Sequence, residues 1–357
     1  MIRHAVERYF NRRWYEGSGS HWLWSPLSRW VTRIARRRRE EFLEEAGRPL
    51  FESSSSTVPP VLVVGNITVG GTGKTPLVIY LIEHLRGCGL KLAVISRGYG
   101  GKAANYPLLV TDQVTPEEAG DEPAMIYQRT GITLVVDPRR RRALQWLAEQ
   151  GDYDLVISDD GLQHYDLPRH YEIAVIDGER GLGNGACLPA GPLREPRERL
   201  ESVDAIVVNG APGERLTSQL REVATPVYTM EFQPQGFISL LGEPRALDGF
   251  TAQEKASMEA IAAIGNPQRF FRTLTGLGLD PKTRPFPDHY GFSSGDFSAT
   301  GQSLLLMTEK DAVKVKGVLS PKRKRYAYYL AITAVLSGDL INDIITRFKG
   351  ETRNVRI

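Results

Sequence analysis

Short apolar runs alternate with longer segments of mixed polarity along much of the chain. Runs rich in valine and isoleucine predict buried strands, and several of the segments between them have the length and periodicity of helices. The first predicted strand starts at Val61, others lie at 92–96, 132–136, 154–158, 172–176 and 205–208, and helices are expected at 76–86, around 123–129 and at 140–150. This alternation indicates an α/β fold with a mostly parallel sheet and helices on both faces. In such sheets, ligands bind beyond the carboxyl ends of the strands.

The pattern changes after about residue 223, where prolines and glycines interrupt the apolar runs as far as Phe250. A second apolar-rich unit begins near Ala256, with predicted strands at 261–264, 304–307 and 327–332 and a helix from Pro267. We therefore expect four parts, namely an N-terminal arm with a linker (1–57), a main α/β domain (58–225), a linker region (226–250) and a smaller C-terminal α/β domain (251–357).

The N-terminal arm contains a predicted amphipathic helix. Ser25-Pro26 is a favourable helix start, and the apolar residues Leu27, Trp30, Val31 and Ile34 follow at helical spacing. No stretch of the arm approaches the roughly 20 apolar residues that a membrane-spanning helix needs. An arm of this kind is expected to lie on a membrane surface instead of crossing it.

Charge sharpens this picture, because the first forty residues hold ten arginines against three glutamates, while the whole chain carries only +3. Four of the five tryptophans also lie in the arm. Three interpretations remain open: attachment to anionic lipid, binding of nucleic acid, or a docked helix with a solvated basic face. Tryptophan favours the lipid interface, and the net acidity of the rest of the chain argues against nucleic acid.

Length and composition fit a soluble globular protein, with 357 residues of which 41% are hydrophobic. The two cysteines offer neither a disulfide framework nor paired metal ligands, so a reducing compartment is expected.

The first strand runs into a glycine-rich loop, VGNITVGGTGKT, that ends in Gly73-Lys74-Thr75. A glycine loop between a strand and a helix cradles phosphate, the lysine adds charge and the hydroxyl can bind Mg²⁺. The usual spacing places a glycine at the position of Thr68, so the match is irregular. We nevertheless predict that the loop binds ATP through Thr68, Val69, Gly70, Gly71, Thr72, Gly73, Lys74 and Thr75.

Two adjacent carboxylates, Asp159 and Asp160, close the predicted strand LVISDD. Beside a phosphate loop, such residues are placed to hold Mg²⁺, although two acids can also cap the turn before Gly161. The following Gln163 and His164 are candidates for orienting phosphate or substrate, or for ordinary packing.

Three further residues have open roles. Arg140 begins a predicted helix, where it either reaches phosphate or belongs to a solvated arginine run. Asp121 in GDEP is either a helix cap or a catalytic group, and His289 in PDHY lies in a proline-rich loop of the second domain.

The motifs together resemble one known family, the tetraacyldisaccharide 4′-kinases, over nearly the whole chain. The matching segments are VGNITVGGTGKTP (64–76), SRGYGGK (96–102), GDEP (120–123), DDGLQH (159–164), GNG with LPAGPLREP (183–196), IGNPQRFF (264–271), PDHY (287–290) and MTEKDAVK (307–314). The irregular Thr68 is itself a feature of this family.

The resemblance implies a P-loop NTPase-like fold and specific residue roles. Asp121 would activate the sugar hydroxyl with His289 as its partner, and Thr75, Asp159, Asp160 and Glu195 would hold Mg²⁺. Less secure positions around the substrates are Glu122, Arg140, Gln163, His164, Arg194 and Asp288.

The implied reaction is ATP-dependent phosphorylation of the 4′-hydroxyl of tetraacyldisaccharide 1-phosphate, which gives lipid IVA in lipid A biosynthesis. The implied location is the cytoplasmic face of the bacterial inner membrane, which the arm contacts peripherally. Nucleic acid is not expected as a ligand, and no protein partner is implied. The alternative function is a non-kinase P-loop ATPase that acts on a membrane-bound partner.

Overall fold

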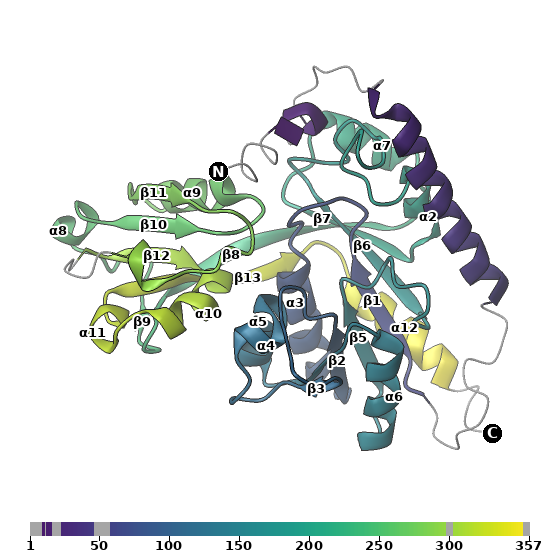
Figure 1. Ribbon diagram of the computed structural model, residues 1–357, viewed down its shortest axis with the longest axis horizontal. Coiled ribbons are helices and arrows are strands. Elements are labelled where there is room, and N and C mark those ends of the chain that lie inside the picture. The colour runs from purple at the N-terminus through teal and green to yellow at the C-terminus, as the bar shows by residue number, and fades with distance from the viewer. Residues whose placement is uncertain (1–8, 11, 16–22, 46–57, 298–302, 353–357) are drawn as a thin grey trace.

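The computed structural model describes residues 9–10, 12–15, 23–45, 58–297 and 303–352, and shows two lobes that share one sheet (Figure 1). The 13-stranded sheet has the order β11-β10-β12-β13-β8-β7-β6-β1-β5-β2-β4-β3, with β9 paired to β8. Neighbouring strands are parallel except in the pairs β13–β8, β3–β4 and β8–β9. The predicted α/β fold with a mostly parallel sheet is therefore confirmed.

Apart from the edge strand β3, the strands of the larger lobe consist mostly of buried apolar residues, as expected where helices cover both faces of a sheet. Its strands are β1 (Val61–Gly65), β2 (Leu92–Ser96), β3 (Leu108–Leu109), β4 (Thr133–Val136), β5 (Leu155–Asp159), β6 (Tyr171–Asp177) and β7 (Ala205–Asn209). Its helices are α3 (Lys74–Gly87), α4 (Pro116–Ala119), α5 (Asp121–Thr130), α6 (Arg140–Gln150), η2 (Arg197–Ser202) and α7 (Glu214–Arg221), and α12 (Leu340–Thr352) joins them from the C-terminal end.

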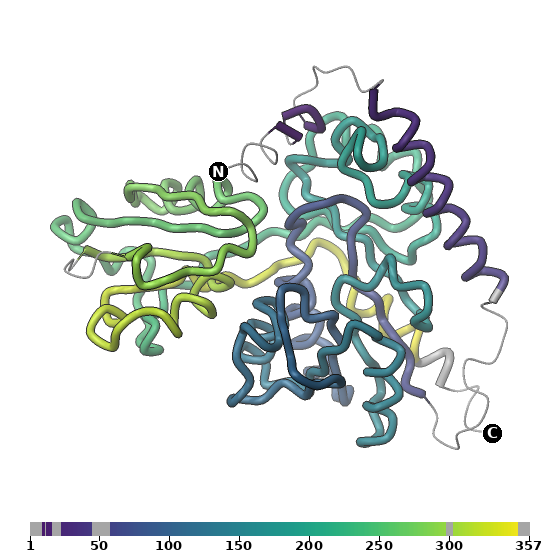
Figure 2. The backbone as a smooth tube through the Cα atoms, viewed as in Figure 1, coloured from purple at the N-terminus to yellow at the C-terminus, as the bar shows by residue number. Residues whose placement is uncertain are grey.

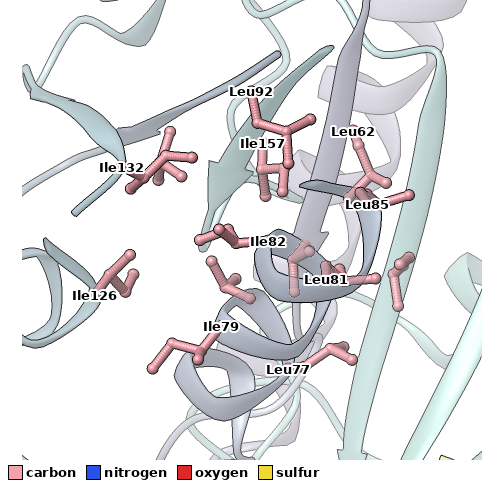
Figure 3. Packing of buried hydrophobic residues seen from close by; sticks show 14 of the residues in the cluster. Leu62, Leu77, Ile79, Leu81, Ile82, Leu85, Leu92, Ile126, Ile132 and Ile157 are labelled. Atoms are coloured by element: carbon pink, nitrogen blue, oxygen red, sulfur yellow. The ribbon is translucent and has the colours of Figure 1, made fainter. Parts of the chain in front are cut away.

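Helices cover the sheet of this lobe on both faces. One apolar cluster joins α3, α5 and α12 to the strands, and a second cluster on the other face includes α6 and α7. Figure 3 shows side chains of α3, among them Leu81, Ile82 and Leu85, packed toward Leu62 of β1 and Ile157 of β5. This packing fixes the end of β1, and with it the glycine-rich loop, against the start of α3.

The smaller lobe continues the same sheet. Its strands are β8 (Val227–Ser239), β9 (Pro244–Arg245), β10 (Glu259–Ala262), β11 (Lys282–Pro285), β12 (Leu305–Thr308) and β13 (Ala327–Leu336). Its helices are α8 (Ala252–Lys255), α9 (Pro267–Gly276), η3 (Ser294–Asp296), α10 (Glu309–Val318) and α11 (Pro321–Lys324).

Two long antiparallel strands connect the lobes, since β8 pairs with β7 of the larger lobe and with β13 along its length. Figure 2 shows the backbone of both strands running without a break from one lobe to the other. The segment 226–250, which we expected as a linker, thus contains the strands β8 and β9. The division of the chain into four parts stays a prediction.

Helix α2 (Ser25–Glu45) runs along the outer edge of the larger lobe (Figure 1). Ser28 Oγ donates a hydrogen bond to the carbonyl of Cys187 at 2.7 Å, and Val31 packs against the larger-lobe core. Leu27 and Trp30, which we expected on the same apolar face, are 45% and 58% exposed. Of the predicted arm and linker (1–57), residues 1–8, 11, 16–22 and 46–57 lie outside the described residues.

Candidate active site

The glycine-rich loop leads from the end of β1 to Lys74, the first residue of α3. Gly73 precedes the helix with a φ of 93°, in the left-handed region that favours glycine. A Cβ at this position would lie 2.3 Å from Nδ2 of Asn209, so a larger residue does not fit. That nitrogen donates to the carbonyl of Thr72 at 2.9 Å and fixes the loop. The first N–H groups of a helix have no partner within the helix, so the loop ends in an anion-binding position.

Lys74 forms an ion pair with Asp160, with 3.2 Å between Nζ and Oδ1. The other carboxylate oxygen of Asp160 lies 3.4 Å from Nη1 of Arg194. Burial alone would raise the pKa of Asp160, but Lys74 and Arg194 hold it well below its ordinary value. An ionised carboxylate therefore accompanies the loop lysine.

Asp159 ends β5 beside the loop, because β5 is parallel to β1 and Val64 lies opposite Asp159. The aspartate is 1% exposed, and burial, followed by the negative charges of Glu122 and Asp160, raises its pKa to about 7. Oδ2 accepts a hydrogen bond from Ser96 at 3.3 Å, whereas the buried Oδ1 accepts none from the described residues.

This environment fits a divalent cation, which would engage the unpartnered oxygen and favour the ionised carboxylate. In the described part of the chain, no group of three or more His, Cys, Asp and Glu side chains is arranged to hold a metal. Mg²⁺ in phosphoryl-transfer sites commonly uses one or two carboxylates together with substrate phosphates. That Thr75, Asp159 and Asp160 supply such a partial set of ligands stays a prediction.

Arg140 is buried and organises the backbone of the two aspartates. Its Nη2 donates to the carbonyl of Asp159 at 2.6 Å and to that of Asp160 at 2.9 Å. Burial lowers the pKa of Arg140 to about 10, so the guanidinium stays charged at neutral pH. Burial, followed by the nearby charges of Arg140 and Arg97, lowers the pKa of His164 to about 3, which leaves this imidazole neutral.

Glu195 is 3% exposed and both of its carboxylate oxygens have protein donors. Gln163 Nε2 donates to Oε1 at 2.7 Å, while Oε2 accepts from the Tyr165 hydroxyl at 2.5 Å and lies 3.4 Å from Nε of Arg199. Gln163 also donates to the carbonyl of Asn66, at the start of the glycine-rich loop, at 2.9 Å. Because of these partners, we propose that Glu195 positions Gln163 and does not act as the metal ligand that we expected.

Asp121 is the first residue of α5, and Gly120 occupies the N-cap position, so the interpretation of Asp121 as the cap is wrong. Its Oδ2 lies 3.4 Å from Nδ1 of His289 and 3.6 Å from Nζ of Lys314. Burial would raise the pKa of Asp121, but the contacts with His289 and Lys314 lower it below its ordinary value. The imidazole packs against Tyr99, with 4.9 Å between ring centroids. The larger lobe thus supplies the carboxylate, and the smaller lobe supplies the histidine.

Lys310 of α10 contacts the sequence neighbours of this pair, Glu122 after Asp121 and Asp288 before His289. Its Nζ donates to Oε1 of Glu122 at 2.9 Å and lies 3.5 Å from both Oδ1 of Asp288 and Nε2 of His289. Burial opposes the charged form, but Glu122 and Asp288 raise the pKa of Lys310 above its ordinary value. A charged lysine of the smaller lobe therefore contacts Glu122 of the larger lobe, next to Asp121 and His289.

A cavity of about 420 Å³ lies between the lobes and connects these groups. The glycine-rich loop from Gly71 to Thr75 lines it from the larger lobe, together with Glu122. Asp288 and Lys310 line it from the smaller lobe. The phosphate-binding loop and the residues beside Asp121 and His289 therefore face one shared space.

Comparison with known proteins gives one consistent result. The family model described as LpxK, tetraacyldisaccharide-1-P 4′-kinase, matches residues 20–349. The chain belongs to this family. It is 46% identical over 324 residues to a tetraacyldisaccharide 4′-kinase of Pseudomonas putida (strain W619), covering 90% of each chain. It is also 47% identical to the enzyme of the same name from Pseudomonas aeruginosa (strain LESB58), covering 91% of this chain and 92% of the relative.

A solved LpxK structure has the same fold. The structure of LpxK from Aquifex aeolicus in complex with ATP superposes with a TM-score of 0.73 at 26% identity, covering 92% of this chain and 99% of that one. The predicted family, the kinase class and the α/β fold are thereby confirmed. No helix among the described residues of this LpxK-family chain is long and apolar enough to cross a membrane.

Sequence reasoning found most of the residues that the fold gathers in this LpxK-family site. It missed the two lysines, Lys310 and Lys314, although both lie in the motif MTEKDAVK that carried part of the resemblance. Their spacing of four places them on one face of α10, which indicated that both side chains approach the same part of the structure. It also missed Asn209, which lies outside the quoted motifs, and Arg269, which lies in the motif IGNPQRFF (264–271).

Proposed function

We propose that this chain transfers the γ-phosphate of ATP to the 4′-hydroxyl of tetraacyldisaccharide 1-phosphate, which gives lipid IVA. The observation that carries the proposal is the contact of Asp121 with His289 across the lobes, beside a cavity that the Lys74 loop also lines. A donor site for phosphate and a carboxylate with a histidine partner are the two halves that such a reaction needs.

Asp121 acts as the general base in this mechanism. A sugar hydroxyl is barely acidic, so a carboxylate that receives its proton during transfer lowers the barrier. The lowered pKa of Asp121 keeps the carboxylate ionised, and His289 orients it through the 3.4 Å contact with Nδ1. Assembly of the pair from both lobes excludes water from the acceptor position and limits hydrolysis of ATP.

The phosphate side stabilises the transferring group. Lys74 and the helix N-terminus of α3 bind the terminal phosphates, while Arg194 supports Asp160 next to the lysine. Thr75, Asp159 and Asp160 would hold Mg²⁺, which neutralises charge on the phosphate oxygens when bound. Arg140 keeps the backbone of both aspartates in place from the interior.

The arm is proposed to attach the enzyme peripherally to the cytoplasmic face of the inner membrane, where its acylated substrate resides. Exposed Leu27 and Trp30 on α2 support this role, since the helix is docked through Ser28 and Val31 and still leaves them outward. Exposed arginines on the same helix, among them Arg29 and Arg33, add attraction to anionic lipid.

The test is the identity of the product. The purified chain is incubated with ATP, Mg²⁺ and tetraacyldisaccharide 1-phosphate, and the lipid is analysed by mass spectrometry. The proposal expects a lipid heavier by one phosphate, with ADP formed in equal amount. Free phosphate without a phosphorylated lipid would contradict the proposal and favour the alternative, a P-loop ATPase acting on a membrane-bound partner.

A further inference from the structure

Arg269 of α9 lies at the cavity, where the smaller lobe meets the glycine-rich loop. Its Nη2 donates to Oδ1 of Asn209 at 2.9 Å, and its guanidinium carbon lies 4.9 Å from the centre of the Phe232 ring. Asp177 is a more distant partner, with 3.9 Å between Oδ2 and Nη1. The guanidinium is thus held in place while most of its five N–H donors remain available to a ligand in the cavity.

Asn209 connects this arginine to the loop itself. Its amide oxygen accepts from Arg269, and its amide nitrogen donates to the carbonyl of Thr72 at 2.9 Å. Gly73 approaches so closely that a Cβ there would overlap the Asn209 amide. Arg269 therefore sits two hydrogen bonds from the loop, although it belongs to the other lobe.

The helix that follows the loop is short of one donor. Pro76 is the third residue of α3 and has no backbone N–H, and the N–H of Leu77 already donates to the carbonyl of Gly73 at 3.4 Å. Only Lys74 and Thr75 then supply free N–H groups in the first turn of this helix. A phosphate chain that extends past them needs a donor from elsewhere.

The position of Arg269 within the cavity indicates which phosphate it meets. Lys74 and Asp160 mark the end of the nucleotide that takes part in transfer. Apolar side chains line the cavity near Arg269, among them Phe232 and Phe270, and suit the nucleoside. The α-phosphate joins these two parts of ATP.

We propose that Arg269 binds the α-phosphate of the nucleotide from the smaller lobe and replaces the donor that Pro76 removes from α3. The proposal rests on the proposed function in taking ATP as the nucleotide. An arginine suits this role, because its planar fork matches two phosphate oxygens and stays charged. A bound nucleotide would then contact both lobes, through Arg269 of the smaller lobe and Lys74 of the larger lobe.

The experiment measures equilibrium binding of ATP and of ADP, each with Mg²⁺, to the full chain by calorimetry in the absence of lipid. Arg269→Gln removes the charge and keeps a neutral amide donor on a shorter side chain. Arg272→Gln is the matched control, because Arg272 lies on the same helix and also bridges the lobes, through a 2.6 Å ion pair with Glu179. Arg269→Lys serves as a second variant that keeps the charge without the fork.

We expect Arg269→Gln to raise the dissociation constants of ATP and ADP by about tenfold and by similar factors, since both carry the α-phosphate. Arg269→Lys should lie between this variant and the wild type, and Arg272→Gln should stay within about twofold of the wild type. If Arg269→Gln does not fold, an unchanged affinity in Arg269→Lys overturns the proposal, and an intermediate loss supports it.

Three other results would overturn the proposal. Affinities of Arg269→Gln within twofold of the wild type would exclude a phosphate contact. If Arg272→Gln weakened nucleotide binding equally, the effect would come from contact between the lobes and not from a phosphate contact. If Arg269→Gln weakened the binding of ATP but not of ADP, the contact would be with the γ-phosphate. The binding experiment contains no lipid, so its result does not depend on whether the chain phosphorylates lipid. A failure in the separate phosphorylation assay would count against the proposed function alone.

Discussion

Asp121 shows how the surroundings of one residue decide its role. The motif GDEP alone is compatible with a helix cap, but Gly120 takes the cap position and leaves the carboxylate of Asp121 for His289 and Lys314. Two cationic or potentially cationic groups beside a half-buried carboxylate hold it in the charged form. The same groups therefore set the pH below which the base is lost.

Substitution of Lys314 by Met tests this electrostatic control. Loss of the ammonium 3.6 Å from Oδ2 removes one of the charges that lower the pKa of Asp121, so that pKa rises. Because transfer needs the ionised carboxylate, the acidic limb of kcat against pH should move to higher pH, with little change on the alkaline side. Steady-state rates across the acidic range measure the limb, and superimposable profiles of variant and wild type would refute the assignment.

Several site residues were predictable because they follow strand ends in recognisable motifs. Lys74, Asp159 and Asp160 are of this kind, since parallel strands bring their carboxyl ends to one edge. Arg269 and Lys310 were not, because their positions depend on how the smaller lobe meets the larger one. Glu195 lies beside Arg194 in sequence, yet its carboxylate turns to the buried Arg199 while Arg194 turns to Asp160.

Helix α2 was predicted from its start at Ser25-Pro26 and its apolar spacing, and it begins at Ser25. What the spacing did not predict is which edge of the apolar stripe the larger lobe covers. Val31 packs on the larger lobe, while Leu27 and Trp30 point away from it. A helical pattern gives the period of the apolar residues, but the docking surface decides which of them are covered.

Replacement of both Leu27 and Trp30 by Glu tests the exposed apolar face. The double variant should bind vesicles with an anionic lipid component at least about tenfold more weakly, because it loses apolar burial and gains repulsion. Leu43→Glu is the control, since Leu43 is 55% exposed on the same helix but lies on the opposite side. Flotation with vesicles measures the bound fraction, and equal binding by all three proteins would remove this face from the membrane contact.

At the scale of the whole molecule, the two lobes share one sheet, and β8 and β13 carry it between them. We expected a linker here because Pro234 and Gly236 interrupt the apolar pattern. The register of the pair shifts between Ala331 and Ile332, opposite these residues, so Gln235 is left without a counterpart. Such a bulge accommodates a proline within a strand, and its position could not be predicted from the local sequence pattern.

This continuous sheet brings Asp121 of one lobe within 3.4 Å of His289 of the other, next to the cavity that Glu122 and Asp288 line. The central claim is that the pair acts together on the acceptor. The measurement is the single-turnover rate at which labelled γ-phosphate passes from ATP to tetraacyldisaccharide 1-phosphate. Asp121→Asn should slow transfer by about 10²- to 10⁴-fold and leave the dissociation constant of ATP within about twofold, because the carboxylate serves only the hydroxyl. Transfer by Asp121→Asn at the wild-type rate would contradict the account.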